Sequence, residues 1–360
     1  MSEAAQQSSA IARARELDAE GRHDDAINEL AEAAQRGDVE ATTQLAKRII
    51  VGDRAPRLRR QGVGLLRDAV KMGGAEAADR LAVVHASGAF GPPDWRGALG
   101  LLMLAAERGW DPARAQLEVL GSMLGADGAA PRLGAPTSPA AAPALVDDAG
   151  LRALLVPAPG AVVHDDPRIC AFPSFVGGAV CDWLIGQARR KLKRARVYDA
   201  YSKTDIVDES RTNSCAVFNM MEADLVHLLV QARMAAGCGQ PARHMEAPTV
   251  LHYAVGETIE DHYDFIDPAH PGYAEEIRRS GNRVITFLVY LNEGYEGGDT
   301  VFPKLGVEHA GRRGEGLFFV NTGRDSQADL RTLHSGRPPT RGEKWVFSQF
   351  VRDRPELIED

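Results

Sequence analysis

The sequence has few cysteines and no long apolar run. Its 360 residues include four cysteines, none of them in a C-x-x-C pair, and so sparse a set suits a reducing compartment better than a secreted disulfide framework. No apolar stretch approaches the roughly 18 residues that a membrane-spanning helix needs. The N-terminal MSEAAQQSSA lacks the basic and apolar regions of a signal peptide. We therefore expect a cytoplasmic protein with no membrane partner.

An excess of positive charge is also missing. The formal net charge is −8, which argues against a general binder of nucleic acid or of anionic membranes. What remains is an ordinary globular composition, with 44% hydrophobic and 26% charged residues. The length allows two domains with separate cores.

The first third of the chain repeats itself every 36 residues. Three similar segments, AAQRGDVEATTQLA, AVKMGGAEAADRLA and AAERGWDPARAQLE, begin at Ala33, Ala69 and Ala105. Within a unit, apolar residues recur at three- and four-residue steps, which is the period of a helix, and a repeated glycine falls where the first helix must end. One helical pair cannot bury its own apolar face, so we expect neighbouring units to stack.

The spacing and the A-x-x-G-x-x-x-A pattern resemble Sel1-like repeats, relatives of the tetratricopeptide repeat. The resemblance covers roughly residues 10–122 and implies an α-solenoid of helical hairpins that binds a protein partner, although the helices could equally serve only to stabilise the rest. Residues 125–150 are rich in Gly, Ala and Pro without a helical or strand period, which predicts a linker. The predicted domains are therefore 1–124 and 151–360.

The second half is built of short β-rich runs after one helical stretch. The helical pattern extends over residues 172–194 and ends in the basic RRKLKR. The runs TVLHYA, RVITFLVYL, TVF, GLFFV and KWVFSQFV follow, separated by clusters of Gly, Asn, Asp and Pro. Short strands broken by turn signals predict a β-sandwich or barrel.

The candidate chemistry begins in the stretch IEDHYDFID. His262 and Asp264 are two residues apart, so in an extended chain they project from the same face and can share a metal ion. His334, just before a later strand, is the candidate third ligand. Two histidines and one carboxylate bind Fe(II) as a facial triad or bind catalytic zinc. The helical H-E-x-x-H motif that usually supplies zinc ligands in hydrolases is absent, so iron is favoured.

A lysine shortly after the third ligand adds a second signal. Lys344 opens the strand-like KWVFSQFV, ten residues beyond His334. A lysine that points inward among apolar residues is costly unless an anion meets it. The distal carboxylate of 2-oxoglutarate, bound beside the metal, is such an anion. The alternative is a lysine at the mouth of the strand that faces water.

Residues 160–355 resemble the catalytic domain of the prolyl 4-hydroxylase branch of the Fe(II)/2-oxoglutarate dioxygenases. The matching motifs are YAVGETIEDHYDF, RVITFLVYLNEGYEGGDTVFP and LHSGRPPTRGEKWVFSQFVR. The resemblance implies a double-stranded β-helix, or jelly roll, with flanking helices. It implies hydroxylation of a protein or peptide at a prolyl residue, with Fe(II), 2-oxoglutarate and O₂ as cofactors, ascorbate as reductant, and succinate and CO₂ as co-products. Two alternatives stay open: a different residue or a small molecule as substrate, and a non-catalytic adaptor that binds proteins through its repeats.

The resemblance also implies a role for each matching residue. Three would hold the catalytic iron, three would bind the distal carboxylate of 2-oxoglutarate and two would border the substrate: His262, Asp264 and His334 for the iron, Lys344, Tyr253 and Thr286 for the carboxylate, and Arg211 and Phe350 for the substrate. At the substrate edge the sequence departs from the family pattern, with Ile259 in place of the usual tyrosine and Asp261 in place of a proline. The segment Asp267–Asn282 predicts a loop beside the mouth that helps to choose the substrate.

Overall fold

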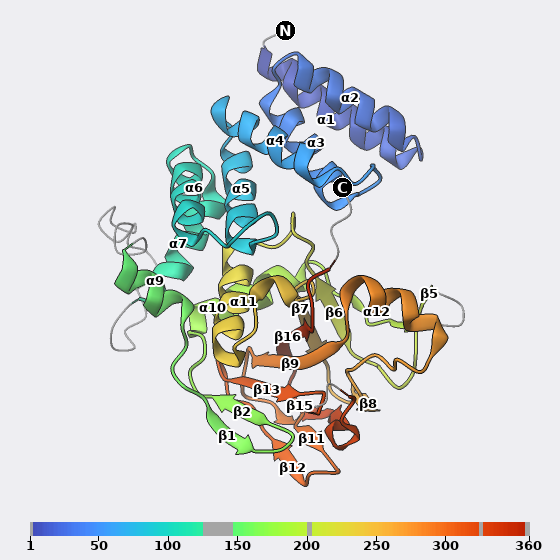
Figure 1. Cartoon of the computed structure of the whole chain (residues 1–360). Coiled ribbons are helices and arrows are strands. Elements are labelled where there is room, and N and C mark those ends of the chain that lie inside the picture. Colours follow the sequence, from blue (N-terminus) through green and yellow to red (C-terminus); the bar gives the residue numbers. More distant parts are fainter. Residues whose placement is uncertain (1–2, 125–146, 200–203, 324–326, 357–360) are drawn as a thin grey trace.

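The computed structural model describes residues 3–124, 147–199, 204–323 and 327–356. Its N-terminal part is a stack of antiparallel helices, and its C-terminal part consists of β-sheets with helices on one face (Figure 1). Among the described residues the stack contains seven helices: α1 (Glu3–Ala19), α2 (His23–Gln35), α3 (Val39–Val51), α4 (Arg59–Lys71), α5 (Ala75–Ser87), α6 (Trp95–Glu107) and α7 (Asp111–Ser122). The expected helical repeats are confirmed.

The repeated glycines end every second helix of the stack. Gly37, Gly73 and Gly109 follow α2, α4 and α6 with φ values of 89°, 101° and 88°. This left-handed conformation is strained for residues with a Cβ, and glycine adopts it freely. Small buried alanines such as Ala41 and Ala77 then let successive helices approach closely. The period in the sequence is therefore the period of the helical hairpins.

Eight strands form a jelly roll of two facing antiparallel sheets. Four belong to the larger sheet, in the order β13-β9-β16-β7, and four form the smaller one, in the order β12-β11-β14-β8. In chain order they are β7 (Thr249–Tyr253), β8 (Ile259–His262), β9 (Arg283–Tyr290), β11 (Thr300–Phe302), β12 (Val307–His309), β13 (Gly316–Val320), β14 (His334–Gly336) and β16 (Lys344–Arg352). The predicted double-stranded β-helix is confirmed.

Further strands extend the larger sheet and line its ends. The larger sheet continues through β1 (Ala161–His164) and β2 (Ile169–Phe172) on one side and through β6 (Ser214–Val217) and β3 (Lys193–Arg194) on the other. Two small ribbons complete the set, β4 (Val197–Asp199) with β5 (Thr204–Ile206), and β10 (Glu296–Gly297) with β15 (Pro339–Arg341).

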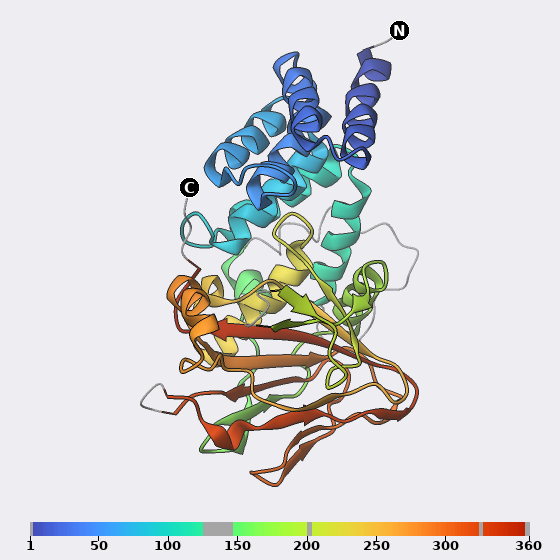
Figure 2. The same cartoon turned by 90° about the vertical axis from the view of Figure 1, so that its right-hand side faces the viewer.

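Alternating side chains give the larger sheet two different faces. Along β13, Phe318 packs into the core that includes the helices, whereas Leu317 and Phe319 pack toward the smaller sheet. This is the two-residue period of a strand buried on both faces. The helical layer contains α9 (Asp148–Leu155), α10 (Gly178–Arg189) and α11 (Leu225–Cys238), and the stack of repeats lies beyond it (Figures 1 and 2). The space between the two sheets is thereby left for a site.

Two boundaries differ from the sequence-based expectation. The helix expected over residues 172–194 is shorter, because Phe172 ends strand β2 and Lys193–Arg194 form strand β3. The expected loop 267–282 contains the short helices η3 (Pro271–Tyr273) and α12 (Ala274–Ser280). Most of the expected linker, residues 125–146, lies outside the described residues, and its last residues belong to α9. No helix in the described ranges has both the length and the apolar character to cross a membrane.

Candidate metal centre

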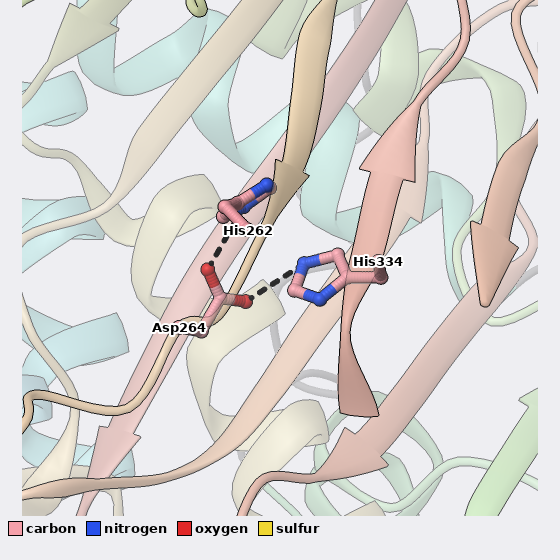
Figure 3. Close-up of side chains that lie close together, drawn as sticks. All are labelled: His262, Asp264 and His334. Atoms are coloured by element: carbon pink, nitrogen blue, oxygen red, sulfur yellow. Dashed lines mark ion pairs between the residues drawn. The ribbon is translucent and has the colours of Figure 1, made fainter. Parts of the chain in front are cut away.

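The three expected ligands converge between the sheets at the ends of β8 and β14. His262 is the last residue of β8 and His334 the first of β14, and the antiparallel pairing places the two directly opposite each other. Asp264 follows β8 by two residues and turns its carboxylate toward both imidazoles (Figure 3). One donor atom from each residue lies within 4.8 Å of the other two.

Both imidazoles are oriented by a backbone carbonyl so that Nε2 faces Asp264. Nδ1 of His262 lies 2.8 Å from the carbonyl oxygen of Glu260, and Nδ1 of His334 lies 2.9 Å from that of Thr332. Since a carbonyl only accepts, each Nδ1 carries a proton, and Nε2 is the nitrogen that each ring would offer to a metal. These Nε2 atoms lie 3.3 and 3.2 Å from the two carboxylate oxygens of Asp264.

The charge of the cluster also suits a cation. Burial alone would raise the pKa of Asp264, but the imidazoles of His334 and His262 outweigh it and hold the pKa well below its usual range. The carboxylate is thus ionised, with its side chain only 6% exposed. Two imidazole nitrogens and one carboxylate oxygen are the ligand set of the Fe(II) facial triad. The residues present therefore fit an Fe(II) ion.

Lys344 is a buried cation that lacks an anionic partner. It is 2% exposed, and its Nζ donates a hydrogen bond of 2.6 Å to the carbonyl oxygen of Gly298. Within the described parts of the chain it forms no ion pair, and the rings of Tyr253 and Tyr290 flank it at 5.2 and 5.5 Å. Burial lowers the pKa of Lys344 to about 8. A carboxylate from a ligand would relieve this cost.

Tyr253 lies beside this lysine, and Thr300 lines the same cavity. Tyr253 is opposite Lys344 in the pairing of β7 with β16 and is 3% exposed. Its hydroxyl has no hydrogen bond to any residue that the structure describes. Thr300, which the sequence reasoning missed, is 4% exposed and places Oγ1 2.8 Å from the hydroxyl of Tyr290. The signal that could have found it is its place in the GGDTVFP motif, at the start of strand β11.

Thr286 contacts one of the metal ligands. Its Oγ1 donates a hydrogen bond of 2.7 Å to Oδ2 of Asp264. The single hydroxyl proton is thereby used on a metal ligand. Thr286 also lines the cavity, so its role toward 2-oxoglutarate stays a prediction, and its bond to Asp264 is an additional contact that the sequence did not predict.

One cavity joins all eight predicted site residues. Its volume is about 940 Å³, and its walls include the ligand triad, the Lys344 region, Arg211 and Phe350. Pockets for small ligands usually measure roughly 300–1,000 Å³. The cavity is thus large enough for a dicarboxylate at its inner end and part of a larger substrate at its mouth.

The mouth is organised by an ion-pair cluster that the sequence reasoning also missed. The guanidinium of Arg283 stacks 3.9 Å from the ring centre of Phe350 and forms an ion pair of 2.7 Å with Glu246. Arg352 pairs with the same glutamate at 2.7 Å and with Glu276 of α12 at 2.6 Å. Because Glu276 and Tyr273 line the cavity, the segment 267–282 forms part of its wall.

Arg211 lines the cavity from the segment that precedes β6. A β-bridge pairs it with Ile259, the position at which the sequence departs from the family pattern. Its Nε lies 3.4 Å from Oδ1 of Asn213, and its side chain lines the cavity.

Comparison with known proteins bears on this site. The sequence model of the 2OG-Fe(II) oxygenase superfamily matches residues 248–352, which include the triad and Lys344. A probable prolyl 4-hydroxylase 3 of Arabidopsis thaliana is 30% identical over 210 residues, which are 53% of this chain and 71% of that protein. The chain belongs to the prolyl 4-hydroxylase branch of the 2OG-Fe(II) oxygenase superfamily.

The chain is also similar to further relatives and to solved structures. A probable prolyl 4-hydroxylase 9 of the same plant is 29% identical over 53% of this oxygenase and 70% of its own length. The prolyl 4-hydroxylase subunit alpha-1 of Rattus norvegicus is 29% identical, and the alignment spans 37% of that subunit. Among solved structures, a viral collagen prolyl hydroxylase from Paramecium Bursaria Chlorella virus-1 is similar over 51% of this chain and 94% of its own, with 24% identity and a TM-score of 0.39.

The helical part of this oxygenase has a separate neighbour. A Sel1 repeat protein from Oxalobacter formigenes is similar over 38% of this chain and 55% of its own, with 24% identity and a TM-score of 0.30.

This chain is a 2-oxoglutarate-dependent dioxygenase, whose cofactors are Fe(II), 2-oxoglutarate and O₂.

Proposed function

We propose that this oxygenase hydroxylates a prolyl residue of a protein or peptide and forms succinate and CO₂ from 2-oxoglutarate, with ascorbate as reductant. The observation that carries the proposal is the pairing of two sites in one cavity: a His-Asp-His triad and the buried Lys344 ammonium, which forms no ion pair with the described residues. The choice of proline is supported by the matched relatives, which are named prolyl 4-hydroxylases.

His262, Asp264 and His334 would hold the iron, which when bound supplies the activation of O₂ for attack on a C–H bond. The remaining work falls to the chain. Lys344 would bind the distal carboxylate of 2-oxoglutarate as its cation, and the hydroxyl of Tyr253, which has no hydrogen bond to a described residue, would donate to the same group. These two contacts would orient the cosubstrate.

Side chains around His334 keep the centre dry. Phe319 packs edge-on against its imidazole at 4.6 Å between ring centres, and Phe302 lies at 5.5 Å on another side. An apolar wall of this kind excludes water and strengthens every charge interaction inside. His262 is more exposed, with 35% of its side chain accessible, and so marks the side from which the substrate enters. Arg211 and Phe350 border that entrance and would flank the prolyl ring.

The repeats would bring the target protein to this entrance, as a stacked helical array presents an extended surface for a partner. Pull-downs of the target with full-length Leu58→Glu and Met72→Glu variants, which change exposed apolar residues of the repeats, test the role of the repeats.

The reducing environment suggested by four free cysteines, Cys170, Cys181, Cys215 and Cys238, favours a cytoplasmic location. Cell fractionation with an antibody tests the location.

The activity is tested by succinate formation from 2-oxoglutarate with Fe(II), ascorbate and O₂, first alone and then with proline-containing peptides. Peptide products are examined by mass spectrometry for the mass of one added oxygen atom on proline. Asp264→Ala and Lys344→Met should both abolish turnover, whereas Asp261→Asn, outside the ligand set, should retain it. A hydroxylated residue other than proline would overturn the prolyl assignment, and equal succinate formation by wild type and Asp264→Ala would overturn the catalytic one.

A further inference from the structure

Asn321 is connected to two of the three metal ligands, Asp264 and His334, by chains of hydrogen bonds. It lies immediately after β13 and is fully buried. Its Nδ2 donates a hydrogen bond of 3.0 Å to Oγ1 of Thr286, and Thr286 donates in turn to Oδ2 of Asp264 at 2.7 Å. The side chain therefore acts on Asp264 through one intervening hydroxyl.

The direction of this relay follows from the chemistry of its members. Oγ1 of Thr286 donates its single hydroxyl proton to Oδ2 of Asp264. The hydroxyl oxygen can then only accept from its other neighbour, which requires Nδ2 of Asn321 on that side. If the amide were turned over, Oδ1 would meet an oxygen with no proton to give. Oδ1 of Asn321 has no hydrogen-bond partner among the described residues, which is the cost of this orientation.

The backbone of the same residue supports the second ligand. The carbonyl oxygen of Asn321 accepts from the backbone N–H of Asp329 at 3.0 Å. The carbonyl of Asp329 accepts from Oγ1 of Thr332 at 2.7 Å, and the carbonyl of Thr332 faces Nδ1 of His334 at 2.9 Å. The N–H of Asn321 is itself fixed by a 2.8 Å bond to the carbonyl of Val284 in β9. The turn that carries His334 is thus held in register with the larger sheet.

We propose that Asn321, acting through Thr286, is a positioning residue for the metal centre. By holding Oδ2 of Asp264, the pair leaves Oδ1 as the oxygen offered to the metal, so the carboxylate would bind through one atom. A carboxylate that binds through one atom keeps coordination positions open for 2-oxoglutarate and O₂. Supporting groups of this kind typically change metal affinity by about 10–100-fold when removed. The inference rests on the proposed metal site.

The test uses Co(II) as an air-stable probe of the full-length protein. Thr286→Val removes the hydroxyl at nearly constant shape, Thr286→Ser restores it, and Asn321→Leu and Asn321→Ser remove the amide. The matched control is Thr42→Val in α3, where a threonine 3% exposed donates to the carbonyl of Asp38 at 2.7 Å, far from the cavity. Calorimetry gives the Co(II) affinity, visible absorption reports the coordination, and thermal unfolding of the metal-free protein reports stability.

We expect Thr286→Val and both Asn321 variants to bind Co(II) about 10–100-fold more weakly and to change its absorption spectrum. Thr286→Ser should recover most of the affinity, and Thr42→Val should lose stability without a change in either metal readout. If Thr286→Val keeps the wild-type Co(II) affinity and spectrum but loses stability, the role of Thr286 is purely structural. That result would overturn the inference and leave the proposed function standing. Absence of Co(II) binding by the wild type would overturn the proposed function as well. If Asn321→Leu does not fold, Asn321→Ser and Thr286→Val decide the matter.

Discussion

Oε1 of Gln116 in α7 accepts a hydrogen bond of 3.0 Å from the backbone N–H of Leu225, the first residue of α11. Nε2 of the same glutamine donates to the buried carboxylate of Asp79 in α5 at 2.9 Å. Neighbouring Arg80 donates to the carbonyl oxygens of Met221 and Ala223 at 2.9 and 2.8 Å. Helices of the repeat stack and of the oxygenase therefore share a polar network, set within one continuous apolar core.

The first prediction concerns the centre of that network. Asp79 is 1% exposed and accepts from Arg80, Trp110 and Gln116. Asp79→Ala leaves a buried guanidinium and two other donors without their acceptor, so we expect the free energy of unfolding to fall by about 3–5 kcal/mol. Urea denaturation followed by circular dichroism measures this loss. The control is Asp68→Ala, which removes a surface ion pair with Lys71 and should change stability little; an equal effect in both variants would contradict a buried network.

The second prediction is a pH dependence of 2-oxoglutarate binding. Burial places the pKa of Lys344 at about 8 in the free protein, and only the ammonium form attracts the distal carboxylate. From neutral pH to about pH 8 the affinity should change little, and above pH 8 it should fall by up to about tenfold for each pH unit. Calorimetric titration with Mn(II) present, from neutral to alkaline pH, measures this. In Lys344→Arg, which stays charged, the decline should vanish; a wild-type profile that stays flat to alkaline pH would contradict the role of the lysine.

The third prediction is that the same lysine lowers the stability of the ligand-free protein. Its folded pKa of about 8 lies below the unfolded value, so the unfolded chain binds the extra proton, and stability rises with pH between those two values. Below about pH 8 the charged side chain costs on the order of 3 kcal/mol. Lys344→Met, even after losing the bond to Gly298, should raise the free energy of unfolding at neutral pH by roughly 2 kcal/mol. Thermal and urea unfolding check this against Lys71→Met on the surface, for which no gain is expected.

The ligand pair could be predicted from the sequence because its geometry is local. His262 and Asp264 are two residues apart, which predicts a shared face in an extended chain. In the structure β8 ends at His262, and the bend that follows brings Asp264 to the same point. Lys344 could be predicted for a related reason, since an ammonium that opens an apolar strand demands an anion. The repeated glycines likewise determined the helical hairpins from their spacing alone.

The partners of the threonines could not be predicted in this way. That Thr286 bonds Asp264 and Thr300 bonds Tyr290 depends on how β9 and β11, which belong to different sheets, lie around the cavity. The network of Gln116 depends on contacts between residues more than a hundred positions apart. The apolar pattern places Phe172 in the helix expected over residues 172–194, because an apolar residue fits a helix and a strand equally. Only the pairing of Phe172 with Gly316 in β13 makes Phe172 part of a strand. These features arise from long-range packing, which a local pattern does not contain.

The last prediction concerns the segment 267–282 and the substrate it faces. Glu276 of α12 lines the cavity and is held by Arg352, a residue 7% exposed that also pairs with Glu246. Glu276→Gln weakens this link while leaving the pair of Glu246 with Arg352 intact, so α12 should lose its fixed position at the mouth. We expect KM for a peptide substrate to rise about fivefold, equivalent to roughly 1 kcal/mol, with KM for 2-oxoglutarate unchanged because Lys344 lies at the other end of the cavity.

Steady-state kinetics with each substrate varied in turn separate these two effects. The matched control is Glu275→Gln, one residue earlier on the same helix, because Glu275 pairs only with Arg278 in its own turn, at 2.5 Å among the described residues. Equal peptide KM values in Glu276→Gln and the wild type would show that α12 takes no part in substrate choice. A rise in the KM of both substrates would instead place the effect on the cavity as a whole. Only a selective rise, absent from Glu275→Gln, identifies Glu276 and its ion pair with Arg352 as the contact that sets the substrate side of the mouth.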